Sequence, residues 1–209
     1  MTDEIAAARL AASWLLWYPD TDLLARLDAI EAVCAQAPSA VGTPLTRFTS
    51  HLRATDLVEL QKHYVATFDT KRRTSPYLSF WTDGDTRNRG LAILRFKQAY
   101  LEHGFSIGDE ELPDHLSVVL EFAARGDRLT GDALLVEHRV SIGLLREALA
   151  KAESPYAAVV DGILATLPPL TDEIRERMTQ LARQGPPQES VGLEPFALLP
   201  VLESQGGRR

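Results

Sequence analysis

Apolar residues recur three and four positions apart through most of this chain, and sustained alternation of apolar and polar residues is absent. The first spacing places apolar side chains on one face of an α-helix, whereas alternation is typical of a half-buried strand. The pattern therefore predicts an all-α protein. Because 45% of the 209 residues are hydrophobic, the chain can bury one sizeable core. We expect a single-domain bundle of about eight to ten helices.

Capping residues, prolines and glycines divide this pattern into separate helices. A first helix is expected from residue 2 to about 17, and a second from residue 20 or 21 to 37. Thr43 is placed to cap a third helix, with Pro44 at its first position, where a missing N–H costs nothing. Asp56 and Glu59 have capping-box spacing and predict a fourth helix, whose apolar stripe continues to residue 68. Later helices are expected over residues 92–103, 113–124, 130–153, 154–167 and 171–185.

Two stretches depart from helical spacing. Residues 69–85 mix bases, a Ser-Pro pair and Asp-Gly, which predicts an irregular connection, and long connections often carry function. Trp81 in this stretch and Trp17 before an earlier turn are expected to be exposed, and such aromatic residues commonly anchor partners. Prolines and glycines after residue 185 predict a helical domain over residues 1–185 and a flexible C-terminal tail over 186–209, although "LEPFALLPVL" is apolar enough to dock.

The charge balance narrows the choice of partners. With 29 acidic and 22 basic residues the formal charge is -7, which argues against nucleic acid and favours a basic partner. Cys34, the single cysteine, lies on an apolar helical stripe and is expected to be a buried, unreactive thiol. No segment approaches the roughly 20 apolar residues needed to cross a bilayer, and the N-terminal run lacks a cleavage-site pattern. We expect a cytoplasmic protein without stable membrane insertion.

The usual signatures of catalysis are missing. The five histidines are not spaced to share a helical face, so no metal site is predicted. Phosphate-loop and nucleophile-elbow patterns are absent, and "GDTRNRG" lacks the glycine spacing of a dinucleotide site, so no cofactor and no enzymatic activity are predicted. Arg87 and Arg89, near a helix start, leave anion binding as a weaker alternative.

The stretch "GDEELPDHLSVVLEF" sets a carboxylate beside an imidazole, Asp114 and His115, directly after Pro113. Four roles are open for this pair: a helix start, a catalytic dyad, half of a metal site, or part of a protein-binding surface. Adjacent residues project about 100° apart on a helix, which disfavours a dyad. We expect Asp114 to cap the following helix, and His115 to lie in its first turn without a capping role.

Three motifs follow one another along the chain: "YVATFD", "DGDTRNRGLAILRFKQAYLEHGF" and "ELPDHLSVVLEFAA". Together, over residues 11–124, they resemble the NarJ type of redox-enzyme maturation chaperone, the nitrate reductase delta subunit or molybdenum cofactor assembly chaperone, which is related to the wider TorD group. The resemblance implies a TorD-like, all-helical, non-enzymatic chaperone. Such a chaperone would bind the apo catalytic (alpha) subunit of respiratory nitrate reductase, including its N-terminal segment, and assist molybdenum cofactor insertion before membrane docking.

The resemblance also implies a client-binding site, with His115 facing a groove that accepts the client. An acidic rim around an apolar groove would favour a basic amphipathic segment. Ser117 stands where close relatives are expected to carry proline, which lets the following helix begin without interruption. The implied client-binding residues are Tyr64, Phe68 and Asp69, then Arg87, Arg89 and Gly90, and finally Glu111, Leu112, Pro113, Asp114 and His115.

The residues alone leave two other classes open. One is a small helical enzyme or anion-binding protein that uses the Asp114–His115 pair or Arg87 and Arg89. The other is a helical subunit that stays in the mature reductase.

Overall fold

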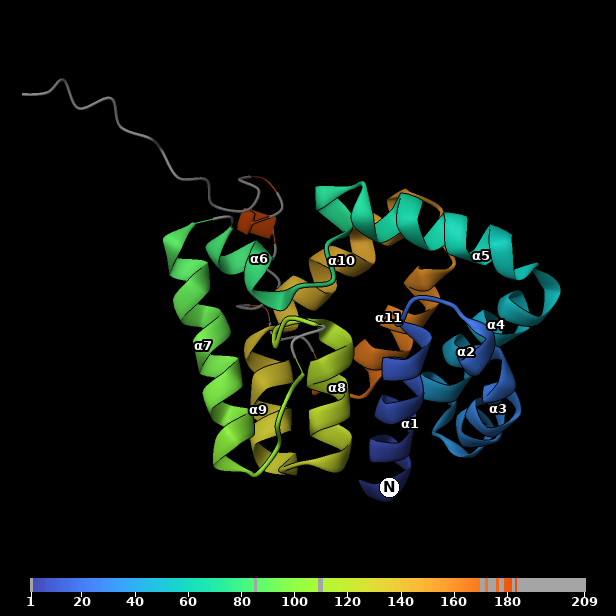
Figure 1. Ribbon diagram of the computed structural model, residues 1–209, viewed down its shortest axis with the longest axis horizontal. Coiled ribbons are helices and arrows are strands. Elements are labelled where there is room, and N and C mark those ends of the chain that lie inside the picture. Colours follow the sequence, from blue (N-terminus) through green and yellow to red (C-terminus); the bar gives the residue numbers. More distant parts are fainter. Residues whose placement is uncertain are drawn as a thin grey trace, which may run out of the picture.

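The computed structural model describes residues 2–84, 86–108 and 111–169, together with residues 172, 176, 179–181 and 183. Within these residues the predicted all-α fold is confirmed (Figure 1), and the one pairing of extended backbone is an isolated bridge between Tyr77 and His115. The elements are α1 (Thr2–Leu15), α2 (Thr21–Ala25), α3 (Leu27–Gln36), α4 (Ser39–Ala54), α5 (Leu57–Tyr64), the π-helical turn η1 (Val65–Asp69), the 3-10 turn η2 (Arg72–Thr74), α6 (Leu78–Asp83), α7 (Arg87–Glu102), α8 (Leu116–Arg125), α9 (Arg128–Glu137), α10 (Arg139–Lys151) and α11 (Tyr156–Ala165).

Two predicted helices are each divided in two, and α6 was not predicted, so that the eight helices predicted up to residue 167 become the eleven α-helices α1–α11 of the described part of the chain. The second predicted helix breaks at Arg26, between α2 and α3, and the predicted helix over 130–153 breaks at His138, between α9 and α10. The second break follows from packing, because α9 packs against α8 whereas α10 packs against α11 and α6. A straight helix would not place apolar stripes against both sets of neighbours.

The start of the third predicted helix was misplaced. α4 begins at Ser39, and Pro44 lies inside it, so Thr43 does not cap it. The early start brings the first turn of α4 against the end of α3, and Gly42 permits this contact because a Cβ there would lie 2.1 Å from the carbonyl oxygen of Cys34. Pro44 removes one intrahelical hydrogen bond, a loss that tertiary packing of α4 outweighs.

The predicted capping box at the start of α5 does not form. Asp56 precedes the helix but makes no side-chain hydrogen bond to it, and Glu59 instead lies 2.7 Å from Lys62 Nζ. The apolar stripe of this helix is nonetheless correct, because Leu60 and Phe68 are buried and Tyr64 is half-buried. The continuation to Phe68 takes the form of the π-helical turn η1.

The expected irregular connection contains a helix, α6, and this changes the role of its aromatic residues. Phe80 and Trp81 are buried against Val140 and Leu144 of α10. The expectation that Trp81 is exposed was therefore wrong: a short helix with one apolar face covers the side of α10 that α11 leaves open. Trp17 lies at the surface, as expected.

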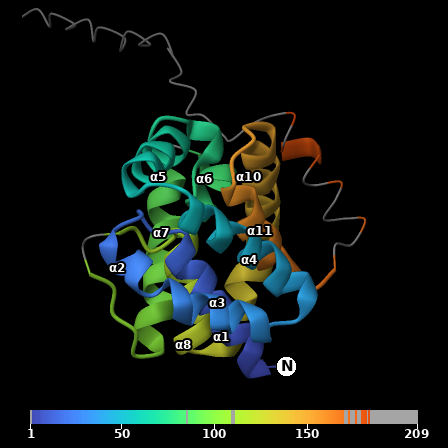
Figure 2. The same cartoon turned by 90° about the vertical axis from the view of Figure 1, so that its right-hand side faces the viewer.

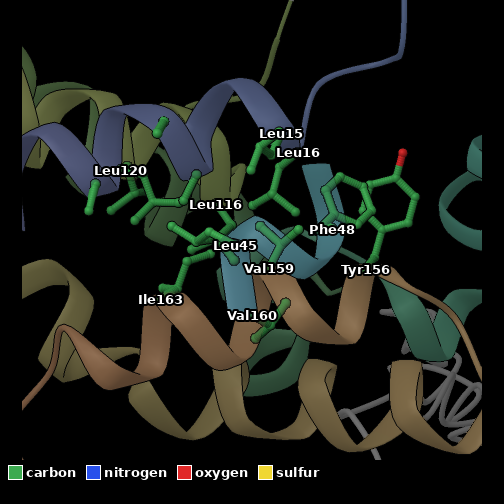
Figure 3. Packing of buried hydrophobic residues seen from close by; sticks show 14 of the residues in the cluster. Leu15, Leu16, Leu45, Phe48, Leu116, Leu120, Tyr156, Val159, Val160 and Ile163 are labelled. Atoms are coloured by element: carbon green, nitrogen blue, oxygen red, sulfur yellow. The ribbon is translucent and has the colours of Figure 1, made fainter. Parts of the chain in front are cut away.

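The main core lies where α1, α4, α8 and α11 meet. α1 packs against α8, and α4 packs against α11. Figure 3 shows their side chains interdigitating: Leu15 and Leu16 from α1, Leu45 and Phe48 from α4, Leu116 and Leu120 from α8, and Tyr156, Val159, Val160 and Ile163 from α11. Cys34 is buried in this core, as predicted, and burial raises the pKa of its thiol to about 11.

A buried arginine links three helices. Arg9 of α1 pairs with Asp132 of α9 and donates from Nε to the hydroxyl of Thr166 (3.2 Å), just after α11. α10 and α11 lie side by side in both views (Figures 1 and 2). None of the helices in the described part of the chain is long and apolar enough to span a membrane. The predicted tail, residues 186–209, lies outside the described residues.

Candidate functional site

The third motif is paired with the segment that precedes α6. The N–H of Leu78 donates to the carbonyl of Asp114 (2.9 Å), and the N–H of Leu116 donates to the carbonyl of Pro76 (3.0 Å), on either side of the isolated bridge. Two segments almost 40 residues apart in sequence are thereby held in register. The loop between α7 and α8 consequently presents its side chains at a fixed position against α6.

Asp114 lies at the centre of this pairing and is fully buried, with 0% of its surface exposed. Its Oδ2 accepts from the hydroxyl of Ser79 (2.5 Å) and from the N–H of Ser79 (3.3 Å), and lies 3.8 Å from Nη2 of Arg89. The prediction that Asp114 caps α8 was wrong. The carboxylate serves the first turn of α6 instead, because the backbone pairing turns it toward that helix.

His115 has the capping role that the sequence predicts for Asp114. It is the N-cap residue of α8, and its Nδ1 accepts from the N–H of Ser117 (3.2 Å) and lies 2.5 Å from the Ser117 hydroxyl. Only 2% of the residue is exposed, so the expectation of a groove-facing ring without a capping role was also wrong. A proline at position 117 would lack the N–H that this cap uses, so Ser117 does suit an uninterrupted helix start.

The environment of His115 favours its neutral form. Burial lowers the pKa of the imidazole, and the charges of Glu111 and Asp114 oppose that shift. Acceptance of a backbone hydrogen bond by Nδ1 places the proton of the neutral ring on Nε2. The edge of the ring meets the Tyr77 ring at 76°, with 5.2 Å between the centroids. Asp114 and His115 are each bonded to a different serine, an arrangement suited to holding a fold rather than to proton transfer between them.

The first motif adds an aromatic cluster. Tyr64 packs edge-on against Tyr18, with ring centroids 5.4 Å apart, and its ring is tilted against that of Phe68, with centroids 4.9 Å apart. Burial raises the pKa of the Tyr64 phenol, and the charges of Asp69 and Glu111 raise it further. Asp69 belongs to the first motif and Glu111 to the third. Because both charges affect the pKa of Tyr64, the two motifs interact electrostatically at this residue.

The second motif contributes Arg87, Arg89 and Gly90 at the start of α7, and these residues lie partly in the interior and partly at the surface. Arg89 turns inward toward Asp114, and its guanidinium carbon lies 5.4 Å from the centroid of the Tyr77 ring. Arg87 and Gly90 are exposed. The three residues therefore do not act as one group, because successive positions on a helix face different directions.

Two residues of this site were missed from the sequence, Tyr77 and Ser79. The Tyr77 hydroxyl donates to Oε1 of Glu111 (3.1 Å), an atom that also accepts from the N–H of Leu112 (2.9 Å). Burial, followed by the charge of Glu111 and this hydrogen bond, raises the pKa of Tyr77 to about 12. The available signal was "SPYLSFW", in which serine and aromatic residues are interspersed within the predicted irregular connection.

The implied client-binding residues thus form two layers. The buried layer consists of Phe68, Pro113, Asp114 and His115, with Arg89 and Tyr64 partly covered. The accessible layer consists of Asp69, Arg87, Gly90, Leu112 and the half-buried Glu111. Val65 and Tyr18, the latter packed against Tyr64, are also exposed. No group of three potential metal ligands occurs in the parts of the chain that the structure covers. We call the accessible layer, together with Tyr18 and Val65, the motif surface.

A family model described as "Nitrate reductase delta subunit" matches residues 34–160. The chain belongs to this family. The family predicted from the three motifs is therefore confirmed. A structure titled as a putative redox enzyme maturation protein from Archaeoglobus fulgidus shares the fold, with a TM-score of 0.58 and 24% identity over 76% of this chain and 91% of that chain.

Several curated relatives match most of the chain. "Probable nitrate reductase molybdenum cofactor assembly chaperone NarJ" of Bacillus subtilis is 31% identical over 158 residues, which are 75% of this chain and 86% of that protein. The Escherichia coli K12 protein named "Nitrate reductase molybdenum cofactor assembly chaperone NarJ" is 32% identical over 181 residues, which cover 84% and 77% of the two chains. These names describe chaperones rather than catalysts, in agreement with the predicted lack of enzymatic activity.

One further relative is larger. "Nitrate reductase-like protein NarX" of Mycobacterium tuberculosis H37Rv is 41% identical over 155 residues, which are 74% of this chain. The match spans only 23% of the length of NarX. The similarity therefore concerns one part of that protein.

Proposed function

We propose that this chain is a cytoplasmic assembly chaperone of a respiratory nitrate reductase. It binds the apo catalytic (alpha) subunit, including the N-terminal segment of that subunit, and assists insertion of the molybdenum cofactor before the enzyme docks at the membrane. The observation that carries this proposal is the match to a NarJ of Bacillus subtilis over 86% of that protein, which is itself named an assembly chaperone.

The motif surface is proposed as the place where the client's N-terminal segment binds. It combines the carboxylates of Asp69 and Glu111 with the exposed apolar side chains of Leu112, Val65 and Tyr18. Apolar side chains accept the apolar face of an amphipathic helix, and carboxylates favour basic residues beside that face. A basic amphipathic segment is the client chemistry that suits this combination.

The buried layer has a different task in this proposal. Asp114 and His115 fix the starts of α6 and α8, and through them the position of Glu111 and Leu112. They are positioning residues that do not touch the client. Substituting them is expected to lower stability first, and client binding only as a consequence.

A peptide titration tests the proposed surface. Calorimetry of the full chain with a synthetic peptide of the client N-terminus should show binding that weakens by about ten-fold or more on Leu112→Ser. Val136→Ser is the matched control, because Val136 is exposed to a similar degree on α9. Glu111→Gln should weaken binding at low salt and change it little at high salt, since salt screens the charge contribution. Equal effects of Leu112→Ser and Val136→Ser would refute the assignment of this surface.

The assembly role is tested separately in cells. A strain lacking this protein should contain the catalytic subunit with little molybdenum and little nitrate reductase activity. The chain should co-purify with the cofactor-free enzyme and be absent from the finished complex. Normal molybdenum content in the deletion strain would refute the role, and retention in the finished complex would indicate a permanent subunit.

A further inference from the structure

The outward face of α7 carries an apolar stripe that the described residues leave exposed. Leu91, Leu94 and Leu101 are 61%, 59% and 54% exposed, whereas Phe96 and Tyr100 on the opposite side of the helix are buried in the core. Together with Gln98, the three leucines line a shallow surface groove. Figure 1 shows α7 at one edge of the molecule.

The spacing of this stripe is that of a coiled-coil seam. Leu91 and Gln98 are seven residues apart, as are Leu94 and Leu101. Leu91 and Gln98 therefore occupy one of the two seam positions of a seven-residue repeat, and Leu94 and Leu101 occupy the other. Such a seam accepts another helix, whose side chains insert between those of α7. Since Phe96 and Tyr100 anchor α7 to the core, the seam is not needed for folding of the chain.

The residues that flank the seam are basic on both sides. Arg95 and Lys97 are the neighbours of the seam in the seven-residue repeat, and both are exposed. α7 as a whole has four basic residues and one acidic residue, in a chain whose net charge is -7. Flanking charges decide which helices pair, because like charges repel across the seam and opposite charges attract. Basic flanks therefore disfavour a second copy of α7 and favour an acidic partner.

We propose that the outward face of α7 binds an amphipathic helix of another protein, with apolar residues along its seam and carboxylates at its flanking positions. The contact is chemically distinct from the client contact at the motif surface, where carboxylates meet a basic segment. The proposal stands on the exposure, spacing and charge of α7, and it does not require that the proposed function is correct.

The test uses two synthetic helical peptides of about three heptads, with leucine at the seam positions and either glutamate or lysine at the flanking positions. Fluorescence anisotropy with the full chain should give a Kd at least about ten-fold lower for the glutamate peptide. Leu94→Ser should remove most of this binding. The double substitution Arg95→Glu and Lys97→Glu should invert the order of the two peptides.

Controls separate this contact from general stickiness and from loss of folding. Leu129→Ser removes an even more exposed leucine, 81% exposed on α9, and should leave peptide binding unchanged. All of the variants change surface residues and should melt close to the parent protein. Equal affinity for the two peptides, or binding that Leu94→Ser does not alter, would overturn the proposal.

Two further outcomes would assign the face to a different occupant and overturn the proposal. A dimer in analytical ultracentrifugation that Leu94→Ser disperses would mean that a second copy covers α7. Carbodiimide cross-links within one chain, from Lys97 to carboxylates of residues 186–209, would mean that the chain's own segment covers it. A monomer without such cross-links, which selects the glutamate peptide, is the expected result.

Discussion

Replacement of Asp114 by alanine should be among the most destabilising changes in this chain. The substitution removes a fully buried acceptor of two hydrogen bonds from Ser79 and leaves Arg89, which is mostly buried, without the nearby carboxylate. A hydrogen bond to a charged group contributes about 1.5–3 kcal/mol, and removal of one partner of a buried ion pair costs about 3–5 kcal/mol. Because the Arg89 contact is long, we expect a total loss of about 3–5 kcal/mol, or roughly 6–20 °C in Tm for a chain of this size.

A double-mutant cycle isolates the contact that matters. Asp114→Ala, Ser79→Ala and the double variant should be unfolded with urea and followed by far-UV circular dichroism. A coupling free energy of about 1.5–3 kcal/mol is expected between the two positions. Asp69→Ala removes an exposed carboxylate of the motif surface and should change stability by less than about 0.5 kcal/mol. Additive effects of the Asp114 and Ser79 substitutions, or a loss below about 1 kcal/mol for Asp114→Ala, would refute the reasoning.

Three other changes test separate features. Gly90→Ala should stabilise the chain by about 0.5–1 kcal/mol in thermal unfolding, because alanine favours a helix and an added Cβ meets nothing within 4 Å. Gly42→Ala should destabilise the chain, because a Cβ there would lie 2.1 Å from the carbonyl oxygen of Cys34. The reverse order of the two effects would contradict the packing of α4. Burial lowers the pKa of His115 from 6.5, so the folded chain binds this proton more weakly and stability falls as pH drops below about 6.5. His115→Asn keeps a capping residue but removes the titrating ring, so Tm should depend less on pH between about pH 7.5 and 5. An unchanged dependence of Tm on pH would contradict the conclusion that the buried ring is neutral. Arg9→Met should cost about 2–4 kcal/mol, since it leaves the carboxylate of Asp132 without its buried partner, and a neutral effect would show that this ion pair is not needed.

The family could be predicted from the sequence, but the roles of its motif residues could not. The three motifs indicated the nitrate reductase delta-subunit family because their order along the chain is specific. Nothing in the spacing of "ELPDH" showed that Asp114 bonds to Ser79 or that His115 caps α8. Both bonds depend on backbone pairing with a segment almost 40 residues earlier, and a reading of local capping preferences does not include such a partner.

Local periodicity by itself determined the all-α class, the apolar faces of most helices and the buried Cys34, because each depends on residues within one or two helical turns. Tertiary structure alone decided where α4 begins, that the helix over 130–153 divides at His138, and that Trp81 is buried by α10. In each case a contact between distant segments outweighed a local preference of about 1 kcal/mol or less, since burial of one large apolar side chain is worth about 1.5–3 kcal/mol. The same balance turned Asp114 inward: its local preference was to cap a helix, and the fold supplied a stronger set of hydrogen bonds.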